Sequence, residues 1–177
     1  MKYSLNHYRT HDASFARDLK ESEAAVHATA DALRAAGITD VHVPATQCRP
    51  DESQMAAYSD DGDMFAAGLR VEVKQRRVQF TGPDDFPYED IIVDVAHAWE
   101  KAHRAGGKPI FAYVIWNRDL SACMAILGQS RHAWRVEQRM DRFKKRRRRF
   151  LLAPASCFIS FQTLVDTIIA DVVFRHY

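Results

Sequence analysis

The stretch from Met64 to Phe80 constrains the fold most, because it alternates apolar and polar residues on both sides of a single glycine. Alternation with a period of two is typical of a half-buried β-strand. We expect two antiparallel strands, about Met64–Ala66 and Leu69–Phe80, joined by the two-residue loop Ala67–Gly68. A short loop of this kind sets the pairing register of the two strands.

Three charged side chains meet in the expected register, which places Asp63 opposite Glu72 and Asp61 opposite Lys74. Glu72 and Lys74 share a strand face because they are two residues apart, and directly opposed Cβ atoms lie roughly 5 Å apart. Opposed like charges destabilise a sheet, so we expect the acid pair to be neutralised. A hard divalent cation held by oxygen ligands is the natural candidate. The competing interpretation is a surface hairpin with Asp61–Lys74 and Asp63–Arg70 ion pairs.

Asp63, Glu72 and Lys74 resemble the Asp…Glu-x-Lys signature of the PD-(D/E)XK, or restriction-endonuclease-like, nuclease superfamily. A later stretch, FPYEDIIVDVAHAWEKA followed by PIFAYVIWNRD, is similar to small phage-type members of that group. The resemblance covers the motif itself and a core of about residues 19–116. Gly62 stands where the name-giving pattern has proline, at a position that varies within the family.

The resemblance implies a mixed sheet flanked by helices, a Mg²⁺ (or Mn²⁺) cofactor and hydrolysis of phosphodiester bonds in DNA, with RNA as the alternative. It implies that Asp63, Glu72 and the backbone carbonyl of Val73 bind the metal. Lys74 would orient or activate the attacking water. A metal ion suits this chemistry because it lowers the pKa of a bound water and stabilises charge on phosphate oxygens.

Three further residues are accessory candidates. Family members often take another acid from the first helix, where Glu21 and Glu23 are both available. The alternative is that these are solvated acids, favoured early in a helix by its dipole. Gln79 is a candidate for contact with substrate or with metal-bound water, and the alternative is an ordinary polar residue of an edge strand.

The basic segment Arg131–Arg149 is the second strong signal. It holds ten Lys and Arg residues against two acids, although the whole chain has a formal net charge of only +2. Each phosphate contact releases counterions, so such a run predicts nucleic-acid binding with steep salt dependence and little sequence preference. The spacing of its first four arginines predicts one basic helical face, with Trp134 nearby as a stacking surface. The expected contacts are Arg131, Arg135, Arg139, Arg142, Lys144, Lys145, Arg146, Arg147, Arg148 and Arg149. A solvated basic helix, or a tract for another polyanion, is the alternative.

The remaining pattern predicts one α/β domain in a chain of 177 residues. A stripe with helical period begins at Ser14 and ends near Gly37. Short β-branched or apolar runs indicate strands at residues 41–43, 91–95, 110–116 and 122–127, while residues 96–103 have helical composition. We assign residues 14–127 to the core, 131–149 to a basic extension, and 150–177 to a strand followed by an amphipathic helix.

Several classes of protein are disfavoured by the composition. Three cysteines without C-x-x-C spacing argue against a disulfide framework and against a structural zinc site. The N-terminus lacks a secretory apolar region, and no apolar run reaches the ~20 residues of a membrane span. We therefore expect a cytoplasmic protein with no membrane partner, for which a homodimer is one candidate assembly. The rival to the nuclease is a catalytically inactive protein of the same fold that binds nucleic acid or a host protein.

Overall fold

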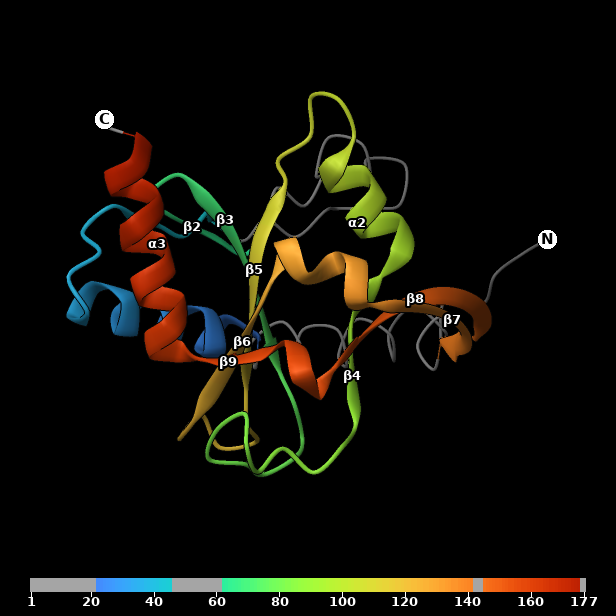
Figure 1. The fold of residues 1–177 in the computed structure, drawn as a ribbon. Coiled ribbons are helices and arrows are strands. Elements are labelled where there is room, and N and C mark those ends of the chain that lie inside the picture. The colour runs from blue at the N-terminus through green and yellow to red at the C-terminus, as the bar shows by residue number, and fades with distance from the viewer. Residues whose placement is uncertain (1–21, 46–61, 142–144, 176–177) are drawn as a thin grey trace, which may run out of the picture.

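The structure, a computed structural model, describes residues 22–45, 62–141 and 145–175 (Figure 1). These residues form a mixed α/β protein built on two sheets. In chain order the elements are a helix over residues 22–35, β1 (Val41–His42), β2 (Met64–Ala66), β3 (Leu69–Gln75), β4 (Asp90–Val95), α2 (Ala96–His103), β5 (Ile110–Trp116), β6 (Cys123–Leu127), the short 3-10 helix η2 (Gly128–Ala133), β7 (Arg135–Asp141), β8 (Arg146–Pro154), the 3-10 turn η3 (Ala155–Cys157), β9 (Phe158–Ser160) and α3 (Phe161–Arg175).

The larger sheet, called the main sheet, has the strand order β1-β2-β3-β5-β6-β9. Its neighbouring strands are antiparallel except β3 and β5, which run parallel. A parallel pair requires a crossover connection. Here the chain leaves β3, forms β4 and α2, and returns as β5. This crossover carries β4 out of the main sheet and into a second one.

The β2–β3 hairpin has the predicted register, with Met64 paired to Val71 and Phe65 to Arg70. Its loop residues Ala67 and Gly68 have φ angles of 51° and 75°. Positive φ at both loop positions is the geometry of a type I′ turn, whose twist matches that of the flanking strands. The prediction of a tight two-residue loop is therefore confirmed.

The predicted end of the second strand at Phe80 is wrong, because β3 ends at Gln75. Gln75 pairs with Trp116, the last residue of β5. Beyond that pair no strand of the described residues runs beside β3, and the chain turns into a loop whose Val78 carbonyl accepts a hydrogen bond from the Arg118 amide. Strand length is thus set by the neighbour, which alternation within residues 69–80 does not reveal.

Two apolar cores lie on opposite faces of the main sheet. On one face Val71 and Val73 pack with residues of the first helix and of α3. On the other face Tyr113 and Ile115 pack with β4, β8 and α2. The molecule therefore has three layers, with the first helix (blue) and α3 (red) on one side of the main sheet and α2 on the other (Figure 1).

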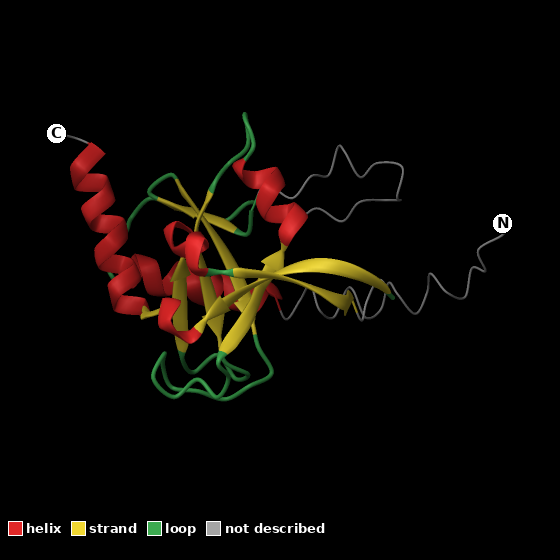
Figure 2. Ribbon diagram, turned by 45° about the vertical axis from the view of Figure 1, so that its right-hand side comes forward, coloured by secondary structure: helices red, strands yellow, loops and turns green. Residues whose placement is uncertain are grey.

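The minor sheet has the order β4-β8-β7 and contains most of the basic segment. The predicted helical face of arginines is wrong, because Arg135–Asp141 is strand β7 and pairs antiparallel with β8. The same segment alternates with a period of two, and the buried end of β8 at Leu151 and Ala153 joins the core beside the main sheet. Burial of this end of β8 favours a strand that pairs with β7 over a helix for the basic segment. Figure 2 shows the resulting hairpin projecting from the body of the molecule.

Other expectations have mixed outcomes. Gly37 ends the first helix with a φ of 92°, whereas the predicted start at Ser14 lies outside the described residues. Cys123 and Cys157 are free and half-buried, and burial raises the pKa of the Cys123 thiol to about 12. No helix within the described ranges combines the length and apolar character that crossing a bilayer requires.

Candidate functional site

The three residues of the predicted patch lie together. Lys74 Nζ lies 3.4 Å from Glu72 Oε2 and 3.8 Å from Asp63 Oδ2. Asp63 directly precedes β2, and its Oδ2 accepts a hydrogen bond of 2.7 Å from the Val73 amide. This bond holds the Asp63 carboxylate against the backbone of β3, where Glu72 and Lys74 alternate onto one face.

Glu72 is neutralised by cations of the protein itself. Arg70 donates two hydrogen bonds to Glu72 Oε1, from Nε at 2.8 Å and from Nη2 at 2.6 Å. Glu72 is only 3% exposed. Burial acts to raise the pKa of Glu72, but the charges of Lys74 and Arg70 outweigh it and lower that pKa. The expectation that an external cation is needed overlooked Arg70, and the alternative Asp63–Arg70 pair gives way to Arg70–Glu72.

Asp94, at the end of β4, is a site residue that sequence reasoning missed. Its Oδ2 accepts a hydrogen bond of 3.1 Å from the Tyr113 hydroxyl, and its Oδ1 accepts one of 2.7 Å from the Val95 amide. Burial raises the pKa of Asp94, although the Lys74 charge opposes this. A signal was present, because an acid inside a β-branched run is a buried charge that requires partners.

Lys74 is held in its charged form by the acids around it. Burial alone would lower its pKa, but Asp63, Glu72 and Asp94 together raise it above the usual range. Lys74 is therefore a cation at neutral pH, suited to hold a water or to stabilise negative charge. Its side chain as a whole is 30% exposed, and its ammonium group lies against Asp63 and Glu72.

Arg76 completes the cluster, which we call the carboxylate patch: Asp63, Glu72 and Asp94 with Arg70, Lys74 and Arg76. Arg76 Nη2 donates to the Ile92 carbonyl, and its Nε is buried with no hydrogen-bond partner among the described residues. Burial lowers the pKa of Arg76, while Asp94 acts to raise it. Three acids thus face three cations, so the patch is close to electrically balanced.

The metal-binding capacity of the patch rests on its two adjacent carboxylates. Asp63 and Glu72 offer hard oxygen donors of the kind that Mg²⁺ prefers, and the Val73 backbone lies against Asp63. Arg70 occupies one of these oxygens. Within the described ranges, no three His, Cys, Asp or Glu side chains are grouped so as to hold a metal ion.

The accessory candidates do not join the patch in the described residues. Glu23 lies on the first helix, which packs on the face of the main sheet opposite to that of Glu72. Glu21 lies outside the described residues. Gln79 lies in the loop after β3, and its amide donates to the Asp119 carboxylate at 3.2 Å. Gln79 therefore supports the β5–β6 turn, contrary to a location on β3.

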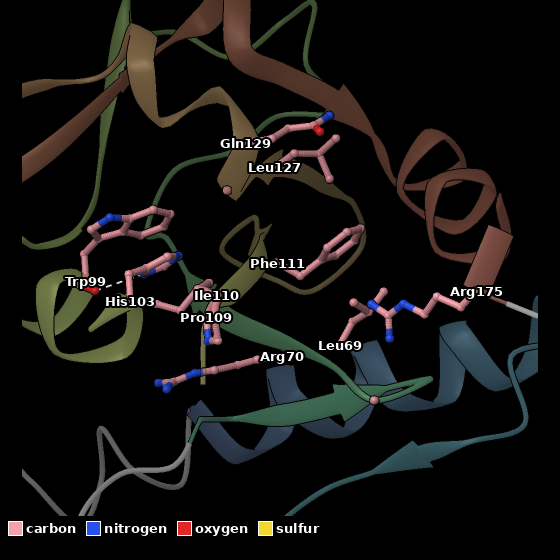
Figure 3. A pocket seen from close by; sticks show the side chains of 12 residues that line it. Leu69, Arg70, Trp99, His103, Pro109, Ile110, Phe111, Leu127, Gln129 and Arg175 are labelled. Atoms are coloured by element: carbon pink, nitrogen blue, oxygen red, sulfur yellow. Dashed lines mark hydrogen bonds between the residues drawn. The ribbon is translucent and has the colours of Figure 1, made fainter. Parts of the chain in front are cut away.

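A cavity of about 480 Å³ adjoins the patch at Arg70 (Figure 3). Its wall includes the His103 imidazole, which stacks on Trp99 with ring centroids 3.6 Å apart. Phe111 and Arg175 line the cavity as well. In Figure 3 the Arg70 side chain points away from Arg175, so the two guanidinium groups mark opposite parts of the cavity.

The basic hairpin divides into a paired part and a part with no ion pair. Four arginines contact acids: Arg135 reaches Asp90 at 2.5 Å, Arg139 reaches Glu137 at 2.9 Å, Arg148 reaches Asp141 at 2.7 Å and Arg149 reaches Glu100 at 3.4 Å. Lys145, Arg146 and Arg147 are exposed and form no ion pair with any described residue. Arg142 and Lys144 lie outside the described residues. The charge available to a polyanion therefore centres on the tip of the hairpin.

Trp134 is not the open stacking surface that its position suggested. It is 5% exposed and packs edge-on against Trp99 and Tyr113. Its indole nitrogen donates to Ser130 Oγ at 2.9 Å. Arg131 lies over the ring at 6.0 Å and donates to the Trp134 carbonyl, so this arginine serves the local fold.

A groove of about 420 Å³ lies between the basic hairpin and the start of α2. It is lined by Ala96, His97, Gln138 and the four arginines from Arg146 to Arg149. Ala96 begins α2 two residues after Asp94, which places their Cα atoms within about 7 Å along the chain. One end of the groove therefore lies near the backbone of Asp94.

Comparison of the chain with protein-family models, with curated proteins and with solved structures finds no significant match. The chemistry of the patch is accordingly the main guide to function.

Proposed function

We propose that this protein is a Mg²⁺-dependent or Mn²⁺-dependent nuclease that hydrolyses phosphodiester bonds of DNA, on a restriction-endonuclease-like fold. The observation that carries the proposal is that the Lys74 ammonium lies 3.4 Å from the Glu72 carboxylate and 3.8 Å from the Asp63 carboxylate. The finer fold assignment is supported by where these residues lie. The acid precedes β2, the Glu-x-Lys motif lies on β3, and a helical crossover leads to a parallel strand.

The division of roles follows from the donor atoms. Asp63 and Glu72 would hold the cation, with the backbone of Val73 alongside. When bound, the cation supplies an activated water and charge stabilisation at phosphate oxygens. Lys74, kept charged by its acid neighbours, would position the attacking water and stabilise the negative charge that develops on the phosphate. Because its pKa is raised, Lys74 is unsuited to act as the base.

We assign DNA binding to the groove and to the tip of the basic hairpin. Lys145, Arg146 and Arg147 are exposed cations without acidic partners among the described residues, and Arg146–Arg149 line the groove beside α2. Contacts to phosphates position a nucleic acid without reading its bases. We therefore expect binding that depends on salt more than on sequence.

One observation favours a second candidate, a non-catalytic binding protein. The Arg70–Glu72 bonds of 2.6 and 2.8 Å already neutralise one of the two metal-binding acids. A patch that is balanced by its own cations is stable without metal. If that state persisted in the presence of Mg²⁺, the groove would remain as a nucleic-acid binding surface only.

The decisive experiment compares the wild type with Lys74→Ala in a DNA cleavage assay with Mg²⁺ or Mn²⁺. Loss of a group that stabilises the transition state should lower the cleavage rate by about 10²-fold or more. DNA affinity should be unchanged, because the hairpin is distant in sequence and unaltered. Lys101→Ala, which removes an exposed lysine of α2, is the matched control and should cleave like the wild type.

Wild-type cleavage by a folded Lys74→Ala variant would contradict the catalytic assignment. Absence of cleavage by the wild type with either metal, together with retained DNA binding, would favour the binding protein. Circular dichroism of each variant verifies that the comparison is made between folded proteins.

A further inference from the structure

We propose that Arg70 is an internal counter-ion that a divalent cation displaces from Glu72, and that the displaced guanidinium then binds a substrate phosphate at the adjoining cavity. The proposal rests on the function proposed above, because it requires a cation site at Asp63 and Glu72. It adds a substrate-positioning residue outside the Asp…Glu-x-Lys triplet.

The first argument is that Arg70 and a divalent cation compete for the same oxygen. Glu72 Oε1 receives two hydrogen bonds from Arg70, which use both lone pairs of a carboxylate oxygen. Glu72 Oε2 faces the Lys74 ammonium at 3.4 Å. Mg²⁺ binds carboxylate oxygens at about 2.0–2.1 Å, so Oε1 becomes a ligand only after Arg70 leaves.

The second argument is that Gly62 makes room for the Arg70–Glu72 contact. A Cβ atom at Gly62 would lie only 2.8 Å from Arg70 Nε, and Gly62 has a φ of 117°. Such a φ is strained for any residue with a side chain. The glycine immediately before Asp63 is therefore linked in space to the arginine that occupies the second acid.

The third argument is that the Arg70 side chain borders a cavity into which it can move when it leaves Glu72. Its side chain lines the cavity of about 480 Å³, and its Nη1 already lies 3.4 Å from the Lys108 carbonyl. Arg70 is 11% exposed in its side chain, so it sits between the buried acid and the open cavity. A guanidinium released there offers a planar set of donors that suits phosphate.

The charge balance of the carboxylate patch also favours displacement of Arg70 by a divalent cation. The patch holds three acids and three cations, so a divalent ion adds positive charge that nothing in the patch cancels. Moving Arg70 outward relieves the repulsion between the guanidinium and the ion. A phosphodiester arriving at the cavity supplies the missing negative charge. Metal binding and substrate binding would thus favour each other through one side chain.

The first test measures Mn²⁺ binding by isothermal titration calorimetry, without substrate. Removing a competing charged hydrogen-bond donor should tighten Mn²⁺ binding by about tenfold in Arg70→Ala and in Arg70→Gln. Arg104→Ala removes one positive charge from an exposed position after α2 and should bind Mn²⁺ like the wild type. Equal affinity of wild type and both Arg70 variants would overturn the inference and leave the proposed nuclease intact. No Mn²⁺ binding by any of these proteins would overturn both.

The second test measures binding of a fluorescently labelled DNA duplex by anisotropy, in EDTA and in saturating Ca²⁺, which takes oxygen ligands as Mg²⁺ does. In EDTA, where Arg70 is engaged with Glu72, Arg70→Ala should bind the duplex like the wild type. In Ca²⁺ it should bind about tenfold more weakly than the wild type, because a charged contact to phosphate is lost. A loss of affinity that is equal in both conditions, or absent in both, would overturn the inference.

Discussion

Two Arg–Glu pairs with the same two-residue spacing differ in how much of their environment is water. Arg70 and Glu72 are 11% and 4% exposed in their side chains, while Arg139 and Glu137 on β7 are 39% and 41% exposed. Both pairs have two hydrogen bonds between guanidinium and carboxylate. Breaking a buried pair leaves an uncompensated charge, whereas water takes over the partner's role at the surface.

We therefore expect Glu72→Gln to lower the free energy of unfolding by about 3 kcal/mol, because Arg70 and Lys74 lose their shared carboxylate. The measurement is urea denaturation in EDTA, which removes metal effects. Glu137→Gln is the matched control and should leave the urea midpoint close to that of the wild type. An equal loss of unfolding free energy in the two variants would mean that burial does not increase the contribution of the Arg70–Glu72 pair to stability.

At the residue scale, what the sequence could reveal depended on how local each interaction is. Alternation correctly placed Glu72 and Lys74 on one face, and the same rule places Arg70 there. The choice of Arg70 between Asp63 and Glu72 depends on rotamers, which alternation does not specify. Asp94 reaches the patch only through the crossover and the Tyr113 hydrogen bond, so no local pattern could have brought it there.

At the element scale, the basic hairpin shows why two periodicities in one segment are hard to separate. Between Arg135 and Asp141 the arginines are spaced as on one face of a helix, and the same residues also alternate as in a β-strand. The sequence is therefore compatible with both structures. Pairing with β8 and burial of its far end at Leu151 resolve the choice. By contrast, the β2–β3 hairpin was predictable because its turn chemistry and alternation agree.

The arginines of this hairpin should contribute unequally to DNA binding. Arg146→Gln with Arg147→Gln removes two cations that have no acidic partner among the described residues. The slope of log K against log salt should fall in magnitude by about 1.8, at ~0.9 per phosphate contact on duplex DNA. The charge-matched pair Arg135→Gln with Arg139→Gln, whose cations already face acids, should change the slope much less. A slope that responds equally to both double variants would show that net charge, and not the hairpin tip, determines binding.

At the scale of the whole molecule, one polar link ties the first helix to the main sheet. Thr29 is fully buried, and its hydroxyl accepts a hydrogen bond of 2.8 Å from the Trp116 indole while donating one of 2.8 Å to the Ala25 carbonyl. The apolar stripe of this helix was predictable from its period. The partner of Thr29 was not, because Trp116 is far along the chain and no local signal joins the two.

Thr29→Val keeps the shape of the side chain and removes the hydroxyl, so the Trp116 N–H is left buried without its acceptor. We expect the free energy of unfolding to fall by about 1–3 kcal/mol, measured by urea denaturation. Thr29→Ser retains the hydroxyl and should lie between Thr29→Val and the wild type. A Thr29→Val protein as stable as the wild type would show that the link carries no net stability.

The ends of the main sheet bear on how copies of this protein behave at high concentration. Among the described residues, the outermost strands of the main sheet are β1, with two residues, and β9, with three. A strand from another molecule that docked on either would gain only a few backbone hydrogen bonds, and short edges are a recurrent protection against such pairing. The long outer strand of the minor sheet, β7, carries Arg135 and Arg139 instead, and edge charges have the same effect. Polymerisation through these three strand edges is thereby disfavoured.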